Sequence, residues 1–279
     1  MSAMFSECLS FGGLGLRISG EIPWQQSPVC APFRTAGESA EHEIYVAISP
    51  ALPAPPENAV SSRGCYRWRC GAERHMLHDN SFNTSYSMTK GNVTELILSP
   101  HYAENLRTQL ILEEADLFDV LAAHGMLVLH SSYALRAEGD AILFSGVSGA
   151  GKSTQAELWR EYAAARVING DRTLIDVSRG TAHGIFYSGT SGICENHSAP
   201  IRAIVLPEQA GENSVTAAGH REAFMRLINQ CAYYPWDADS ASGMTELVAR
   251  LVGRVPVYRL RCRKDEGAVR ALENELRRE

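Results

Sequence analysis

The stretch FSGVSGAGKSTQAEL at 144–158 limits the possible folds of this chain more than any other feature. From Gly146 to Ser153 it follows the pattern G-x-x-x-x-G-K-[ST], in which backbone N–H groups, a lysine and a hydroxyl surround phosphate groups. An apolar segment, AILFS at 141–145, precedes the pattern, and residues 152–165 are helix formers without Pro or Gly. This strand–loop–helix context favours a phosphate-binding loop over a chance Gly/Ser-rich turn.

The loop residues have distinct expected roles. Glycines let the backbone bring several N–H groups toward one centre, where side chains would block a phosphate. Lys152 is expected to neutralise the β- and γ-phosphate oxygens, and Ser153 to place its hydroxyl on Mg²⁺. The expected nucleotide-binding residues are Gly146, Ser148, Gly149, Ala150, Gly151, Lys152, Ser153 and Thr154.

Composition limits the classes of function. The chain has 279 residues and a net charge of −6, which argues against a nucleic-acid binder with a broad basic face. No apolar run approaches the ~18 residues that cross a bilayer, and the first residues lack the pattern of a signal peptide. The seven scattered cysteines include one C-x4-C pair, Cys65 and Cys70, but no second pair that would complete a zinc site. We therefore predict a cytoplasmic protein with free thiols and without nucleic-acid or membrane partners; a homo-oligomer is compatible with the sequence.

Two regions differ in pattern, which predicts two domains. Residues 1–110 contain short alternating segments, such as EIYVAIS at 43–49, between Pro- and Gly-rich turns, and this predicts a β-rich N-terminal domain. Residues 111–279 alternate between strands and helices, which predicts an α/β nucleotide-binding domain. Apolar residues from Leu110 to His124 predict a mostly buried helix that ends at Gly125. The other predicted strands are 126–130, 141–145, 166–170, 172–177, 201–206 and 255–262, and the other predicted helices are 152–165, 220–232, 243–252 and 265–278.

Transfer of a phosphoryl group needs a base and an acceptor site beside the phosphate loop. His130 ends the predicted strand before the loop strand, and Asp171 follows the predicted strand 166–170. Since strand ends on one edge of a sheet converge, we predict that both residues lie beside the phosphate. Without the loop, a surface histidine and a turn aspartate in NGD would be the simpler interpretation.

Three segments occur in an informative order: LHSS at 129–132, GVSGAGKST at 146–154 and VINGDRTLI at 167–175. This order resembles the HPr serine kinase/phosphorylase family, whose catalytic fold is shared with ATP-dependent phosphoenolpyruvate carboxykinase. The resemblance covers about residues 125–262. It implies an α/β P-loop core of the HPr kinase/phosphoenolpyruvate carboxykinase type. The region before it is similar in layout to the N-terminal region of HPr-kinase-like proteins of bacterial peptide-modification clusters, including lasso-peptide clusters.

The resemblance also implies roles for single residues. Lys152 and Ser153 match the loop lysine and the Mg²⁺-ligating hydroxyl, and His130 matches the histidine of the preceding strand. Asp171 matches the second residue of the family's Asp-Asp pair, while Gly170 stands where the first would be. The implied catalytic residues are thus Asp171, His130 and Lys152, and the implied metal ligands are Ser153 and Asp171. One carboxylate must then act as base and metal ligand, or Asp176 assists.

Two further segments carry less information. YSGTSG at 187–192 is a second Gly/Ser loop. The alternatives are a loop that borders the site and an ordinary connecting loop, and the second is slightly favoured. ENHSAPI at 195–201 is similar to the carboxykinase segment E-N-T-R followed by Y-P-I, but it lacks the arginine, so we do not predict carboxykinase chemistry.

Together these features predict an ATP- and Mg²⁺-dependent kinase that transfers the γ-phosphoryl group to a hydroxyl, with a Ser of a peptide or small protein as the expected acceptor. A small-molecule kinase and a non-catalytic nucleotide-sensing module are the alternatives, and Gly170 favours the sensor slightly. The sequence leaves open the identity of the acceptor and any reverse phosphorylase activity.

Overall fold

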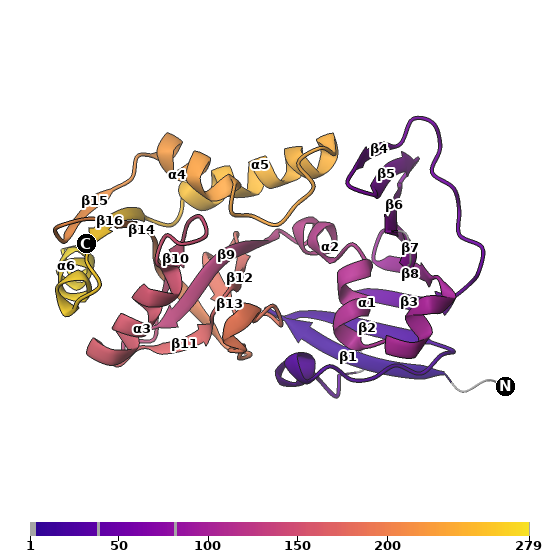
Figure 1. Ribbon diagram of the computed structural model, residues 1–279, viewed down its shortest axis with the longest axis horizontal. Coiled ribbons are helices and arrows are strands. Elements are labelled where there is room, and N and C mark those ends of the chain that lie inside the picture. The colour runs from indigo at the N-terminus through magenta and orange to yellow at the C-terminus, as the bar shows by residue number, and fades with distance from the viewer. Residues whose placement is uncertain (1–3, 38–39, 81–82, 279) are drawn as a thin grey trace. The chain divides into compact units, whose positions relative to one another are not determined.

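The computed structural model describes residues 4–37, 40–80 and 83–278, and the chain forms two compact units. The first unit consists of Met1–Val120 together with Tyr234–Ala241, and the second of Leu121–Tyr233 together with Ser242–Glu279. Each unit combines a β-sheet with helices, so the fold class is mixed α/β (Figure 1). The domain limits that we expected from the sequence, 1–110 and 111–279, stay a prediction.

The described part of the first unit contains an eight-stranded sheet in the order β1-β2-β3-β8-β7-β6-β5-β4. Alternation of apolar and small or polar residues produces these strands; in β2, for example, Leu14, Leu16 and Ile18 are buried. The strands are β1 (Phe5–Phe11), β2 (Leu14–Gly20), β3 (His42–Ile48), β4 (Val60–Ser62), β5 (Cys65–Cys70), β6 (Glu73–Asn80), β7 (Asn83–Lys90) and β8 (Val93–Leu98). Two 3₁₀ segments, Pro28–Phe33 and Pro100–Asn105, complete the N-terminal part of this unit.

The expected single helix from Leu110 to His124 is wrong. Two short helices stand in its place, α1 (Thr108–Glu114) and α2 (Leu117–Ala123). The chain turns between them at Asp116, whose φ of 55° lies in the left-handed region that short polar side chains tolerate best. The buried Asp116 carboxylate accepts a hydrogen bond from Arg67 of β5, a contact between distant residues that helical periodicity does not encode.

The second unit is built on another sheet, in the order β10-β9-β12-β13-β14-β16-β15 within the described residues. An additional parallel pairing of β10 with β14 closes the first five of these strands into a ring, and β11 pairs with β9. The strands are β9 (Met126–Leu135), β10 (Ala141–Ser145), β11 (Arg166–Asn169), β12 (Arg172–Asp176), β13 (Thr181–His183), β14 (Ser198–Gln209), β15 (Ser214–Ala217) and β16 (Val257–Cys262). The helices are α3 (Lys152–Tyr162), α4 (His220–Ile228), α5 (Ala238–Val252) and α6 (Glu266–Leu276).

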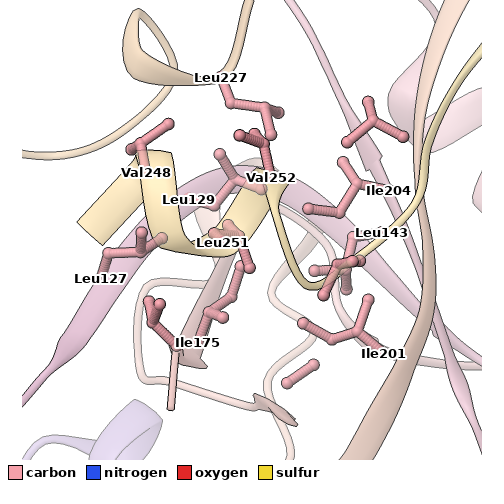
Figure 2. Packing of buried hydrophobic residues seen from close by; sticks show 14 of the residues in the cluster. Leu127, Leu129, Leu143, Ile175, Ile201, Ile204, Leu227, Val248, Leu251 and Val252 are labelled. Atoms are coloured by element: carbon pink, nitrogen blue, oxygen red, sulfur yellow. The ribbon is translucent and has the colours of Figure 1, made fainter. Parts of the chain in front are cut away.

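β10, the strand that leads into the Gly-rich loop, is covered by helices on both faces. Its side chains alternate between two apolar clusters. Leu143 belongs to a cluster with residues of α4 and α5, and Figure 2 shows part of it, including Leu227 and Leu251. Phe144 belongs to the other cluster, with Trp159 of α3 and residues of α6. A strand that is buried on both faces is fixed in place, so the segment that follows it is held at a defined position.

Several predicted elements have different limits in the structure; the strand predicted at 201–206, for example, spans Ser198–Gln209. The strand predicted at 126–130 continues to Leu135, and the helix predicted from 220 ends at Ile228. The helix predicted at 243–252 begins at Ala238, after Asp237, whose carboxylate accepts the backbone N–H groups of Asp239 and Ser240. Among the described residues, every helix is too short or too polar to span a lipid bilayer.

Candidate functional site

Strand register brings the predicted site residues together. β9 runs antiparallel to β10, with Ser131 opposite Ser145, so His130 lies one step beyond the last residue of β10, where the loop begins. On its other side β9 pairs with β12, with His130 opposite Arg172, and the Ser131 N–H donates to the Asp171 carbonyl oxygen at 3.0 Å. Our expectation that His130 ends its strand is wrong; the antiparallel register, not a shared row of strand ends, places it beside the loop.

The loop itself has an open interior. Gly149 and Gly151 have φ angles of 80° and 101°, which L side chains rarely adopt, and a Cβ atom at either position would meet no atom within 4 Å. The concave side of the loop therefore has room that side chains would otherwise fill. α3 begins directly after Gly151, so the positive end of the helix and its free N–H groups point toward this space. These features fit the phosphate groups of a nucleotide.

Lys152 reaches across this loop. Its Nζ donates hydrogen bonds to the carbonyl oxygens of Gly146 at 2.9 Å and Val147 at 3.2 Å. Burial lowers the pKa of Lys152 from its ordinary value, and the negative charge of Asp171 acts in the opposite direction. The ammonium group is thus held by neutral carbonyl groups close to a carboxylate, which leaves its positive charge only partly compensated.

One cavity of about 350 Å³ collects most of the predicted residues. It is lined by His130, Ser148, Gly149, Gly151, Lys152, Ser153, Thr154, Gly170, Asp171 and Gln209. The remaining two predicted loop residues, Gly146 and Ala150, line a neighbouring cavity of about 340 Å³ that also includes Arg226 and Gln230. Sequence reasoning did not select Gln209, Arg226 or Gln230, which carry no recognisable motif.

His130 and Asp171 form a loose pair in this cavity. The His130 Nε2 and Asp171 Oδ1 atoms are 3.5 Å apart, and both side chains expose 33% of their surface. Burial lowers the pKa of His130, the charge of Lys152 lowers it further, and the charge of Asp171 opposes both. The imidazole is therefore neutral at pH 7 and can accept a proton or a hydrogen bond.

Backbone contacts fix both residues. The Asn169 side-chain oxygen accepts the N–H groups of Asp171 and Arg172, each at 3.0 Å, while its amide nitrogen donates to the Ile185 carbonyl oxygen at 2.6 Å. This Asx turn orients Asp171, and the N-G-D sequence carries the signal from which it could have been predicted. On the other side of β9, the His130 N–H donates to the Gln230 carbonyl oxygen at 2.8 Å.

The second Gly/Ser loop, 187–192, lies against Asp171 and therefore borders the candidate site. A Cβ atom on Gly189 would lie 2.7 Å from both Cβ and Cγ of Asp171. A Cβ atom on Gly170 would lie 2.0 Å from the Ser191 Oγ. The position that would hold a first aspartate is therefore occupied by the hydroxyl of Ser191.

Asp176, the alternative carboxylate, lies outside the cavity. It pairs with Met126 at the far end of β12, four residues beyond the Arg172–His130 pair, which corresponds to about 13 Å along a strand. Its Oδ1 accepts hydrogen bonds from the Ser178 hydroxyl at 2.7 Å and the Arg179 N–H at 3.0 Å. These contacts stabilise a turn, and the hydrogen bonds hold the pKa of Asp176 below its ordinary value although burial raises it.

The donors in the cavity fit one kind of metal site. The Ser153 hydroxyl and the Asp171 carboxylate line the same space. Within residues 4–37, 40–80 and 83–278, no group of three or more His, Cys, Asp or Glu side chains is arranged to hold a metal ion. Mg²⁺ in nucleotide sites needs only one or two protein ligands, because phosphate oxygens and waters supply the rest. The two donors therefore fit Mg²⁺ that arrives with a nucleotide.

No protein-family model matches this chain, and a comparison with curated proteins finds no match either.

Proposed function

We propose that this chain is an ATP- and Mg²⁺-dependent kinase that transfers the γ-phosphoryl group to a hydroxyl, with a Ser of a peptide or small protein as the acceptor. The observation that carries the proposal is the single cavity lined by Lys152, Ser153, Asp171 and His130 next to an open Gly-rich loop. In this proposal the fold is a P-loop core of the HPr kinase/phosphoenolpyruvate carboxykinase type, preceded by a β-rich domain.

The loop and its lysine would bind the phosphates. Bound ATP would supply the γ-phosphoryl group, and Mg²⁺ held by Ser153 and Asp171 would reduce its negative charge. Lys152 would exchange its two carbonyl partners for phosphate oxygens, which requires little movement because those carbonyls belong to the same loop. Most of the rate enhancement would then come from positioning and charge stabilisation.

Asp171 would orient the acceptor hydroxyl and take its proton. The Asx turn at Asn169 and the contact with Gly189 fix the carboxylate from two sides, so that little reorganisation is needed during transfer. His130, held neutral beside Lys152, would contact the transferring phosphoryl group. Asp171 would thus act both as base and as Mg²⁺ ligand, which is consistent with the lack of room for a second carboxylate at Gly170.

The lack of room at Gly170 also supports a second candidate function, a nucleotide-sensing module without catalysis. Ser191 occupies the space at Gly170, and a site with one carboxylate could bind a nucleotide without transferring its phosphate. The two proposals differ in turnover and agree on nucleotide binding.

The test is transfer of labelled γ-phosphate from ATP, in the presence of Mg²⁺, to a panel of serine peptides, small proteins and small-molecule alcohols. We expect label on a peptide or protein serine. Label only on small molecules would replace the peptide kinase with a small-molecule kinase. Tight ATP binding without transfer to any acceptor would support the sensor instead.

A further inference from the structure

A cysteine, a histidine and a glutamate form a connected group in the first unit, outside the proposed kinase site. Cys65 of β5 is paired directly with His78 of β6 in the antiparallel register. Residues in this relation lie on the same face of the sheet, with Cβ atoms about 4.5–5.5 Å apart. The His78 Nδ1 is 2.8 Å from the Glu114 Oε2 of α1. The order thiol, imidazole, carboxylate matches the arrangement that activates cysteine nucleophiles.

Glu114 is held as a carboxylate by several donors. Besides His78, its Oε2 accepts the Ser85 hydroxyl at 2.5 Å and its Oε1 accepts the Tyr102 hydroxyl at 2.9 Å. Burial raises the pKa of Glu114, but these hydrogen bonds keep it below the ordinary value. A buried carboxylate with three donors favours a positive charge on the neighbouring imidazole.

His78 carries that positive charge at neutral pH. Burial lowers its pKa, but hydrogen bonds with Cys65 and Glu114 outweigh burial and raise the pKa to about 10. This cation lies directly opposite Cys65 in the strand pair, and a neighbouring cationic side chain is a feature of the sites that hold reactive cysteines.

We propose that Cys65 is a modification site for small peroxides, with His78 as the cation that activates it and Glu114 as the residue that positions His78. The sulfur attacks one peroxide oxygen, an S–O bond forms and the O–O bond breaks. Sulfur is oxidised by two electrons to sulfenic acid, and the peroxide is reduced to water, or to an alcohol for an alkyl peroxide. The proton released by the thiol completes the leaving oxygen. This inference does not rest on the kinase proposal.

The surroundings of Cys65 select small reagents. Only 7% of the residue is exposed, and it packs in a cluster with Met76 and Tyr234, next to Phe118 and Trp236. Because a peroxide is close to water in size, this small exposed fraction favours it over a bulky alkylating reagent. An oxygen added there would place a polar group among apolar side chains of the segment 234–241, which weakens the packing of that segment.

The same strand provides a matched control. Cys70 ends β5, is exposed, and is paired with Glu73 instead of a histidine. Cys70 is therefore more accessible than Cys65 but has no imidazole opposite it. The two thiols therefore separate the effect of exposure from the effect of the imidazole.

The experiment treats the folded full-length protein with hydrogen peroxide for graded times, followed by quenching, denaturation, alkylation of remaining thiols and peptide mass spectrometry. We expect Cys65 to be oxidised at least about tenfold faster than Cys70. In His78→Gln and Glu114→Gln the ratio should fall to about one or below. Hydrogen exchange of 234–241 should increase in the oxidised wild type.

A wild-type Cys65 that is oxidised no faster than Cys70 would overturn the proposal, and this comparison needs no variant. A preference for Cys65 that persists in both folded variants would also overturn it, because exposure and packing would then be the cause.

Discussion

Two groups of charged residues in this chain differ in how completely their charges are compensated. In the first unit, Arg67 is only 3% exposed, and its guanidinium donates to Asp237 at 2.6 Å, Asp116 at 2.9 Å and Asp119. The ring of Tyr234 covers it, with the Arg67 Cζ atom 4.0 Å from the ring centroid. All three nitrogens of this guanidinium donate to carboxylates of the protein itself.

In the second unit, the group of Lys152, His130 and Asp171 is only loosely connected. The closest His130–Asp171 approach is 3.5 Å, and one third of each side chain is exposed. Lys152 bonds to neutral carbonyl groups instead of a carboxylate.

This difference in charge compensation distinguishes a group that stabilises the fold from a group that can bind a ligand. A saturated buried network cannot take a ligand without breaking its own hydrogen bonds, whereas a half-exposed group with long contacts can add a ligand at little cost. We therefore assign the Arg67 group to the anchoring of segment 234–241 within its unit, and we propose nucleotide chemistry for the Lys152 group.

The largest expected effect is on catalysis, at Asp171. Asp171→Asn keeps the size of the side chain but removes its charge, so proton transfer and Mg²⁺ binding both suffer. A general base typically contributes ~10²–10⁴-fold, and we expect transfer of labelled γ-phosphate to fall by at least about 100-fold while ATP binding persists. Asp176→Asn, at the end of β12, is the matched control, since Asp176 lies outside the cavity, and this variant should retain transfer. The reverse result would make Asp176 the base.

The local features of the candidate site could be predicted from the sequence. The loop, β10 and the start of α3 follow from short-range patterns, and so does the choice of Lys152 and Ser153. The break at Asp116 could not be predicted, because it depends on Arg67, 49 residues earlier.

Long-range packing determines two further features of the structure. The inclusion of 234–241 in the first unit depends on Asp237 and Tyr234 meeting Arg67, which no local pattern encodes. The filling of the Gly170 position depends on Ser191 from a separate loop. The sequence around Gly170 does not indicate that Ser191 lies beside it.

The next effect is on stability, at Arg67. Arg67→Leu leaves three buried or partly buried carboxylates without their cation, and we expect a loss of about 3–5 kcal/mol in the free energy of unfolding, measured by urea denaturation. Arg69→Leu is the control, because its ion pair with Asp239 is exposed, at 48% and 58%. That pair should contribute less than about 1 kcal/mol. Equal losses in the two variants would show that the buried network is not the anchor.

A smaller effect is expected where the second loop touches the site. Gly189→Ala adds a Cβ atom 2.7 Å from Asp171 and should displace the carboxylate, which can lower transfer by up to about 100-fold. Gly192→Ala has a similar backbone cost, because φ is 67° at Gly192 and 55° at Gly189. The Cβ atom added at Gly192, however, would meet nothing within 4 Å. Transfer measured for both variants isolates the contact with Asp171. Equal activities would mean that this loop does not position the carboxylate.

The smallest effect concerns pH and the His78–Glu114 pair. The pKa of His78 is raised from 6.5 to about 10 in the folded chain, so its charge adds stability that is fully present below about pH 6.5. This contribution is lost as pH rises through about 10. The stability difference between wild type and His78→Gln should therefore be largest at pH 6 and shrink toward pH 10, in urea denaturation at each pH. A difference that stays constant over this range would show that the imidazole is uncharged.

We propose above all that the loosely compensated group around Lys152 binds the phosphates of ATP. Calorimetric titration of the wild type and of Lys152→Ala with ATP and Mg²⁺ tests it directly, with thermal unfolding of both as the check on folding. Our account predicts binding by the wild type and a loss of most of that affinity in a folded Lys152→Ala. Equal ATP affinity in the two folded proteins, or no binding by the wild type, would contradict it.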